Sequence, residues 1–380
     1  MFEKIIGFIK SLYPEENPVP LHAPCFSGNE KKYLIDCIDT TYVSYVGKYV
    51  SRFEDEIRQF TGAKYAIAVS SGTAALHIAL LLVETAHGDE VITQPLTFVA
   101  TANAIAHCGA QPVFVDVERS TLGLDPEKLE DFLSVNTILK PDGKCYNRAT
   151  GKRIAACVPM HTFGHPVRIE QIIEICQKFM IPVVEDAAEA LGSFYKGQHA
   201  GTFGEIGILS FNGNKPVTTG GGGMIITNDA VLAAKASHLT TTAKKPHPWE
   251  FIHDEVGYNY RMPNINAAVG CAQMECLAES LENKRATAKM YKQFFQEIGI
   301  PFITEPSNAH SNYWLNTIVL KDKQERDLFL EYASAKEIQA RPAWTLMPHL
   351  PMYSHCQTTN IETAKWLEDR LVNIPSSVRI

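Results

Sequence analysis

Seven short apolar runs, each the length of a β-strand, alternate with helical patterns along the first part of the chain. The runs cover residues 65–69, 91–95, 112–116, 154–159, 181–185, 206–211 and 223–227. Helical patterns at 72–83, 126–134 and 168–179 separate several of them. Because alternating strands and helices fold into a parallel sheet covered on both faces, the sequence predicts an α/β protein with a seven-stranded, mostly parallel sheet.

The pattern changes after about residue 251. Residues 264–297 read as one or two long helices, and 313–340 as a strand followed by a helix. We therefore expect a large α/β domain at 21–250 and a smaller C-terminal domain at 251–380. The polar stretch 140–153 is expected to be a surface excursion or short hairpin.

Residues 1–20 are expected to form an N-terminal amphipathic arm. Their apolar positions fall on one helical face (Phe2, Ile5, Ile6, Ile9 and Leu12). Charged residues interrupt the run and no cleavage site follows, so it is not a signal peptide. The arm is predicted to pack on the body or on a partner subunit, with a membrane surface as the alternative. No other run approaches the ~18 apolar residues of a membrane span.

Composition excludes several classes of function. The net charge of −7, without a basic cluster, argues against nucleic-acid binding. The nine cysteines include no C-x-x-C pair, which indicates reduced thiols rather than a disulfide framework or a zinc site. The sequence therefore predicts a cytoplasmic protein without a metal.

Lys215 is the most unusual position in the chain. It follows the strand-like run that ends at Ser210 and Phe211, and a glycine-rich turn with four consecutive glycines, 220–223, comes soon after it. A lysine held away from water loses proton affinity and becomes a nucleophilic amine. Schiff-base chemistry, above all with pyridoxal phosphate (PLP), needs such an amine. The alternative is a surface lysine that caps a turn.

Two further segments suit the same cofactor. Ser71, Gly72 and Thr73 lie between a buried strand and a helix, where backbone N–H groups and a helix N-terminus favour a phosphate. An ordinary N-cap is the alternative. Asp186 follows an apolar strand, so its carboxylate is expected at the ligand-binding edge of the sheet, where it can pair with a pyridine nitrogen. A helix-capping acid or a metal ligand is the alternative there.

These segments, followed by the polar and aromatic run 257–263, resemble one family. In order and spacing they are similar to the DegT/DnrJ/EryC1/StrS sugar-nucleotide aminotransferases, which are PLP enzymes of the aspartate aminotransferase fold (fold type I). Within that family the resemblance is to the C4-aminotransferases of the legionaminic acid and bacillosamine pathways. The segments that carry it are EDAAEALGS at 185–193, SFNGNK at 210–215, YNYR at 258–261, SNYWL at 311–315 and RPAW at 341–344.

The resemblance implies a role for each matching residue. Lys215 would hold PLP and move the proton during transamination. Ser71, Gly72, Thr73 and Ser210 would bind the phosphate, and Asp186 the ring nitrogen; Glu189 would lie near the ring oxygen. Phe98 would stack on the ring, although core packing explains it equally well. Asn259 would reach the phosphate from a neighbouring subunit, which implies a homodimer with shared active sites.

The substrates implied are an amino-acid donor, glutamate in this family, and a UDP-linked 4-keto-6-deoxy sugar. Arg261, Trp314 and Arg341 are candidates for the nucleotide-sugar, since arginine can bind a diphosphate with two parallel hydrogen bonds. His161 is a candidate near the ring or the substrate, or else a structural histidine.

Other activities remain as alternatives. The substrate can instead be a dTDP- or GDP-linked keto sugar aminated at C3 or C4. A sugar dehydratase of the same family would carry histidine in place of Lys215. A PLP-binding regulatory protein without turnover would not need the lysine. A dinucleotide-binding dehydrogenase would need a G-x-G-x-x-G motif, and residues 70–73 do not form one.

Overall fold

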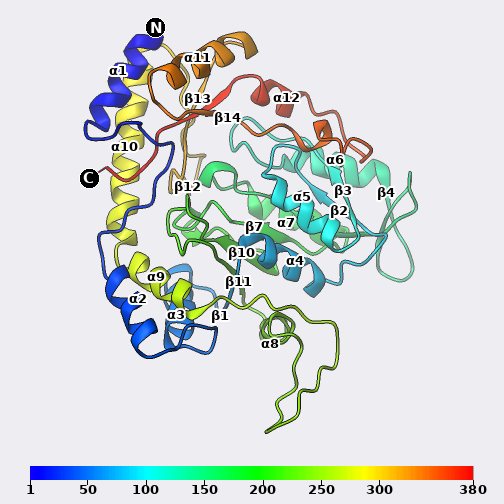
Figure 1. Ribbon diagram of the computed structural model, residues 1–380. Helices are drawn as coiled ribbons and strands as arrows, with labels where there is room; N and C mark the ends of the chain where they lie inside the picture. Colours follow the sequence, from blue (N-terminus) through cyan, green and yellow to red (C-terminus); the bar gives the residue numbers. More distant parts are fainter. Residues whose placement is uncertain (380) are drawn as a thin grey trace.

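A central seven-stranded sheet organises the computed structural model, which describes residues 1–379 (Figure 1). Hydrogen-bonded neighbours give the order β1-β11-β10-β7 and β3-β2-β6, and a parallel bridge from Cys157 to Val183 joins β6 to β7. Only β11 runs antiparallel to its neighbours. The strands are β1 (Tyr65–Val69), β2 (Glu90–Thr93), β3 (Gln111–Phe114), β6 (Ile154–Val158), β7 (Val184–Asp186), β10 (Ile206–Ser210) and β11 (Gly223–Thr227).

Helices cover both faces of this sheet because side chains alternate between the faces along each strand. In β1, Ile67 and Val69 pack in the cluster with helices α4, α5 and α8, whereas Ala66 and Ala68 pack in the cluster with α3 and α9. A third cluster places α6 and α7 against the strands around β6. The helices are α3 (Lys48–Thr61), α4 (Gly72–Leu82), α5 (Val99–His107), α6 (Pro126–Asn136), α7 (Ile169–Lys178), α8 (Ala230–Thr240) and α9 (Asn264–Glu275).

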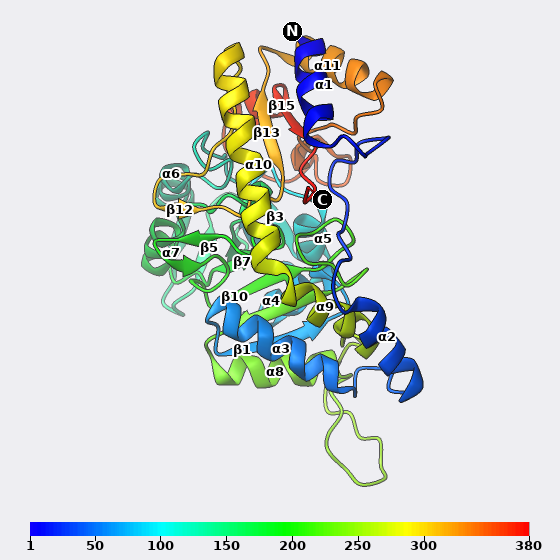
Figure 2. The same ribbon diagram turned by 90° about the vertical axis from the view of Figure 1, so that its left-hand side faces the viewer.

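The C-terminal part forms a second layer of structure above one end of the sheet. The long helix α10 (Leu277–Ile298) runs from the sheet region to this part (Figure 2). There it packs with helix α11 (Lys323–Ala335) and with an antiparallel sheet in the order β13-β15-β14. The strands of that sheet are β13 (Asn316–Val319), β14 (Arg341–Pro342) and β15 (Leu371–Ile374), and the short helix α12 (Glu362–Glu368) precedes β15.

The N-terminal helix α1 (Phe2–Leu12) packs on this C-terminal part. Ile5 and Ile9 are fully buried, in one cluster with Tyr291 and Phe295 of α10 and Phe329 of α11. The apolar face of α1 therefore packs on the body of its own chain, which is the first of the arrangements that the sequence predicts.

The remaining elements are short, apart from helix α2 (Glu30–Asp39), which packs on α9. The expected excursion near residue 140 is an antiparallel hairpin of β4 and β5. These elements are β4 (Thr137–Leu139), β5 (Cys145–Asn147), β8 (Phe194–Tyr195), β9 (Gln198–His199), β12 (Ala309–His310), and the 3-10 turns η1 (Thr162–Gly164) and η2 (Met347–His349).

The predicted fold class and all seven predicted strands are confirmed, with ends that shift by up to three residues. The largest shift is in β7, which begins at Val184 rather than at 181 because Pro182 cannot donate a ladder hydrogen bond. Among residues 1–379, no helix is long and apolar enough to cross a membrane.

Candidate active site

A cavity of about 380 Å³ opens at the carboxyl ends of β6, β7 and β10, within the range typical of small-molecule sites. Strands from distant parts of the sequence end here, and each is followed by a polar residue or turn. Nine residues that the sequence singles out line this cavity: Ser71, Gly72, Thr73, Phe98, Asp186, Glu189, Ser210, Lys215 and Trp314.

The turn between β1 and α4 forms one wall. Ser71 caps the helix, since its Oγ accepts a hydrogen bond from the N–H of Ala74 at 3.0 Å. The N–H groups of the first helical turn have no partner inside a helix and point towards its N-terminus. A Cβ added to Gly72 would lie 3.0 Å from Ser210 Cβ, so the glycine lets the two phosphate-site segments meet closely. This wall is suited to an anion.

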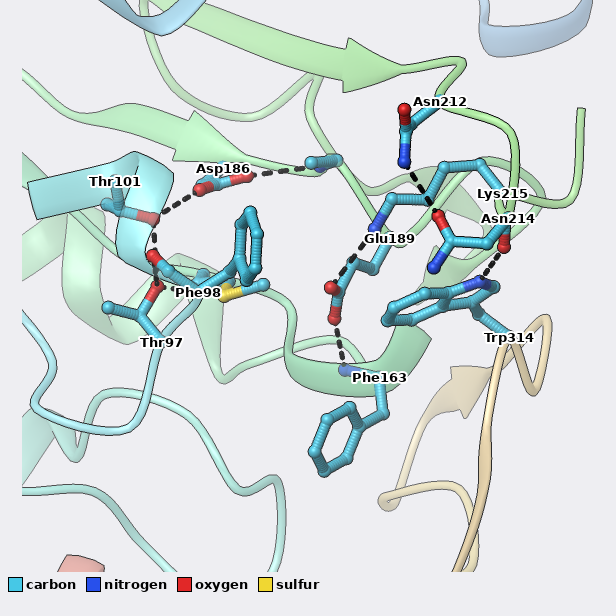
Figure 3. Close-up of polar contacts among 12 residues, drawn as sticks. Thr97, Phe98, Thr101, Phe163, Asp186, Glu189, Asn212, Asn214, Lys215 and Trp314 are labelled. Carbon is cyan, nitrogen blue, oxygen red and sulfur yellow. Dashed lines mark hydrogen bonds and ion pairs between the residues drawn. The ribbon is translucent and has the colours of Figure 1, made fainter. Parts of the chain in front are cut away.

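Asp186, at the end of β7, also lines the cavity and is 2% exposed. Its Oδ2 accepts a hydrogen bond from Thr101 Oγ1 at 2.7 Å, and its Oδ1 accepts one from the N–H of Ala188 at 3.2 Å (Figure 3). Burial raises the pKa of this carboxyl, and the hydrogen bonds together with the charge of Lys215 oppose the shift. A cation placed in the cavity would therefore favour the ionised form.

Lys215 enters the cavity from the loop after β10 and meets Glu189. The Lys215 Nζ lies 3.1 Å from Glu189 Oε1, and their side chains are 10% and 1% exposed. Glu189 Oε2 accepts a hydrogen bond from the N–H of Phe163 at 2.9 Å. Burial raises the pKa of Glu189 to about 7, against the opposing effect of Lys215. The prediction of a lysine withdrawn from water is met, and its immediate partner is a buried carboxyl group.

Aromatic side chains form the mouth of the cavity. Phe98 is 48% exposed, which excludes simple core packing, and its ring centroid lies 6.0 Å from that of Trp344. Trp344 also lines the cavity, as do Met160 and Asn214. Met160 belongs to none of the quoted segments, whereas Asn214 and Trp344 belong to the SFNGNK and RPAW segments, whose predicted site residues are Ser210, Lys215 and Arg341.

Four residues selected from the sequence do not line this cavity. Arg341 and Asn259 are exposed on the surface. Arg261 pairs instead with Glu54, with Nη1 and Oε1 2.9 Å apart. His161 is fully buried; its Nδ1 accepts from the N–H of Val167 at 3.2 Å, so its Nε2 is the donor to Glu185 at 3.0 Å. That bonding is typical of a structural histidine. The substrate roles of these residues, and the reach of Asn259 into a neighbouring subunit, stay predictions.

The residues in the cavity fit PLP by their chemistry. An amine at Lys215, a buried carboxylate at Asp186 and a helix N-terminus at Gly72 match the three groups of the cofactor: an aldehyde, a pyridine nitrogen and a phosphate. All three face one cavity although they come from separate segments of the chain.

The sequence model of the DegT/DnrJ/EryC1/StrS aminotransferase family matches residues 24–380. The chain belongs to this family. It is therefore a PLP-dependent aminotransferase, and the dehydrogenase, dehydratase and non-catalytic alternatives are set aside. The presence of Lys215 inside the cavity agrees with that assignment.

Individual relatives match over nearly their whole length. The chain is 36% identical to GDP-perosamine synthase of Escherichia coli O157:H7 over 358 residues, which is 94% of this chain and 93% of that protein. It is 37% identical to EpsN of Bacillus subtilis, a putative pyridoxal phosphate-dependent aminotransferase, over 90% of this chain and 87% of the relative.

A solved structure confirms the fold. The PLP form of Spr1654 from Streptococcus pneumoniae, described as a putative sugar aminotransferase, superposes with a TM-score of 0.84 at 21% identity, over 96% of this chain and 95% of the other.

Proposed function

We propose that the enzyme transfers an amino group from glutamate to the C4 ketone of a nucleotide-linked 4-keto-6-deoxy sugar. The proposed acceptor is UDP-4-keto-6-deoxy-N-acetylglucosamine. The observation that carries the chemistry is the meeting of the Lys215 amine, the Asp186 carboxylate and the α4 N-terminus in one cavity. The substrate rests on the resemblance of the motifs to the UDP-sugar enzymes.

Each wall of the cavity is assigned a task. When bound, PLP supplies an aldehyde that condenses with amines and a ring that accepts electrons from the bond being broken. Asp186 holds negative charge at the ring nitrogen. The N–H groups at the start of α4, with Ser71, Thr73 and Ser210, bind the phosphate.

Lys215 does the acid–base work. Its Nζ takes the proton from the α-carbon of the amino donor, and in the second half of the reaction it returns a proton to C4 of the sugar. Glu189, 3.1 Å away, keeps the amine oriented between these steps. Phe98 and Trp344 narrow the mouth of the cavity and limit the access of water.

The UDP assignment is supported by where its motif residues lie. Glu189 stands at a position that is commonly Gln or His in the wider family, and it is in direct contact with Lys215. Trp314 and Trp344, from the SNYWL and RPAW segments, both line the cavity. With Ser210 and Lys215 of the SFNGNK segment, four of the five segments that carry the resemblance contribute to the same site.

A GDP-linked keto sugar is the second candidate. The observation in its favour is that relatives named GDP-perosamine synthase, from Escherichia coli, Vibrio cholerae and Caulobacter vibrioides, are 34–36% identical over 94% of this chain.

A product assay separates the two candidates. The purified holoenzyme is given glutamate and, in parallel, UDP-, GDP- and dTDP-linked 4-keto-6-deoxy sugars, and the amino sugar is detected by mass spectrometry. We expect kcat/KM to be highest for the UDP-linked N-acetylated sugar. Amination of the GDP- or dTDP-sugar alone would overturn the UDP assignment and leave the aminotransferase chemistry intact.

The enzyme is further proposed to be a cytoplasmic homodimer with shared sites. Helix α2 and the segment after it expose several large apolar side chains: Ile35, Ile38, Tyr42, Val43, Tyr45 and Val46. The loop after α8 projects away from the body (Figure 1) and carries Trp249 and Phe251, both more than three quarters exposed. Exposed apolar patches of this kind mark protein interfaces.

Subunit mixing tests the shared site. The Lys215→Ala variant is expected to be inactive, and the Asn259→Ala variant weakly active. If Asn259 serves the neighbouring site, mixed dimers contain one site with both wild-type residues, and activity rises on mixing. A dimer whose activity stays at the average of the two variants would place Asn259 in its own subunit's site or outside any site.

A further inference from the structure

Trp314 contacts the loop of the active-site lysine in two ways. Its indole Nε1–H donates a hydrogen bond to the backbone carbonyl of Asn214, the residue before Lys215, at 2.6 Å (Figure 3). The Nζ of Lys215 lies 3.7 Å from the centroid of the Trp314 ring. The indole donor is thus already occupied, and the ring face is occupied by the amine. The indole N–H and this face of the ring are therefore not free to bind a nucleotide-sugar.

Trp314 is 4% exposed, and hydrogen bonds also hold its main chain. Its backbone N–H donates to Asn312 Oδ1 at 2.8 Å, and the Nδ2 of Asn312 donates to the carbonyl of Glu189 at 2.8 Å. Trp314 therefore connects, through its side chain and its main chain, the two segments that carry Lys215 and Glu189.

A second anchor comes from helix α10. Lys284 is 1% exposed, and its Nζ donates to the carbonyls of Trp314 at 3.2 Å and Ser376 at 2.6 Å. A buried lysine is costly unless its hydrogen bonds are made, so these contacts hold the backbone of Trp314 in one place. The position of the indole follows from α10 and from the C-terminal segment after β15.

We propose that Trp314 is a positioning residue for Lys215. The Nε1–H fixes the backbone of the loop that carries Lys215, and the ring face keeps the Nζ within reach of Glu189. This replaces the expectation that Trp314 binds the nucleotide-sugar. The inference rests on the role of Lys215 in the aminotransferase reaction and is independent of which sugar is aminated.

The size of the effect follows from the two contacts. The loss of either contact, the cation–π contact or the hydrogen bond, is expected to change the rate of the donor half-reaction severalfold. Displacement of a reacting group by about 1 Å costs on the order of 100-fold in rate. We expect Trp314→Phe, which keeps a ring and loses the N–H, to slow the donor half-reaction about 10-fold, and Trp314→Leu, which loses both contacts, about 100-fold.

The test uses the holoenzyme and its two half-reactions separately. Reaction with the amino donor alone is followed by the change in cofactor absorbance, and the KM for the nucleotide-sugar is measured at saturating donor. Trp366→Phe is the matched control, because Trp366 lies on α12, outside the cavity. A positioning role predicts a slower donor half-reaction in the Trp314 variants, a KM for the nucleotide-sugar within about twofold of wild type, and no change in Trp366→Phe.

Two other outcomes would overturn the proposal. An unchanged donor half-reaction with a raised KM would make Trp314 a substrate contact. A lowered melting temperature with an unchanged rate per PLP-loaded site would make it structural only. The spectrum of the resting enzyme provides a readout without turnover, and we expect the Trp314 variants to shift it because the amine is displaced. If wild type fails to react with glutamate, the proposed donor is wrong, and the comparison is repeated with a donor that reacts.

Discussion

The turn of residues 71–73, which is proposed to bind the phosphate, approaches the backbone of β11 so closely that only glycine fits at Gly223. Adding a single methyl group at Gly223 tests this. Gly223 begins β11 and pairs with both Val69 and Ser210, at the edge of the cavity. A Cβ at this position would lie 2.4 Å from the carbonyl oxygen of Ser71 and 2.7 Å from the backbone nitrogen of Gly72. These atoms belong to the backbone, so no side chain can turn away to make room.

The overlap sets the expected magnitude. The closest contact would be about 1 Å shorter than an ordinary one, so β11 and the turn after β1 must separate by about that distance. Overpacking of this kind typically costs about 1–3 kcal/mol. If that strain falls on the turn that binds the phosphate, Gly223→Ala weakens PLP binding by about 5- to 150-fold, because 1.4 kcal/mol corresponds to a factor of ten.

A second glycine supplies the control. A Cβ on Gly213, which does not line the cavity, would be 4.0 Å from its nearest neighbour, the carbonyl oxygen of Gly220, and needs no adjustment. Apoprotein of each variant is titrated with PLP, and circular dichroism confirms that both are folded. We expect Gly213→Ala to bind PLP as wild type does and Gly223→Ala to bind it much more weakly. Equal affinity in all three proteins would refute the assignment of this turn to the phosphate.

Three further predictions concern Glu189, Thr101 and helix α1. Because burial raises the pKa of Glu189 from 4.5 to about 7, the folded apoprotein holds an extra proton between these values, and the resulting stability is lost as the pH rises through 7. Denaturant titrations should show the unfolding free energy of wild type falling relative to that of Glu189→Gln between pH 5 and 8, by on the order of a few kcal/mol; a constant difference would contradict the shift. Thr101→Val removes the 2.7 Å hydrogen bond to Asp186 and should weaken PLP binding about tenfold in the same titration, since hydrogen bonds to charged groups are worth about 1.5–3 kcal/mol; unchanged affinity would argue against Asp186 as the partner of the cofactor. Ile9→Ala should cost about 2–5 kcal/mol of stability, whereas Gly7→Ala, exposed on the same helix, should add about 0.5–1 kcal/mol; melting curves in which both are neutral would show that α1 is not part of the core.

Local pattern was sufficient for the parts of the site that lie at strand ends. An apolar run followed at once by a polar residue places Ser71, Asp186 and Ser210 at one edge of the sheet, because parallel strands end together. Lys215 was recognisable because a lysine is unusual between a buried strand and a glycine run.

Contacts between distant segments were beyond such reasoning. Nothing in the sequence indicates that Thr101 meets Asp186, or that the indole of Trp314 is occupied by the carbonyl of Asn214. Arg261 is the opposite case. The sequence predicts that it binds a diphosphate, but the fold pairs it with Glu54. Side-chain partners depend on tertiary packing, which the pattern of one segment does not contain.

Transfer of an amino group from glutamate to the sugar, with Lys215 as the acid–base group, is tested most directly by following the nitrogen atom. Holoenzyme is mixed with ¹⁵N-labelled glutamate in the absence of sugar, and a nucleotide-linked 4-keto sugar is added afterwards. Transamination through Lys215 predicts one 2-oxoglutarate per active site in the first step and one ¹⁵N-amino sugar per site in the second, with neither product from Lys215→Ala. Labelled amino sugar from the Lys215→Ala enzyme at the wild-type rate would contradict it.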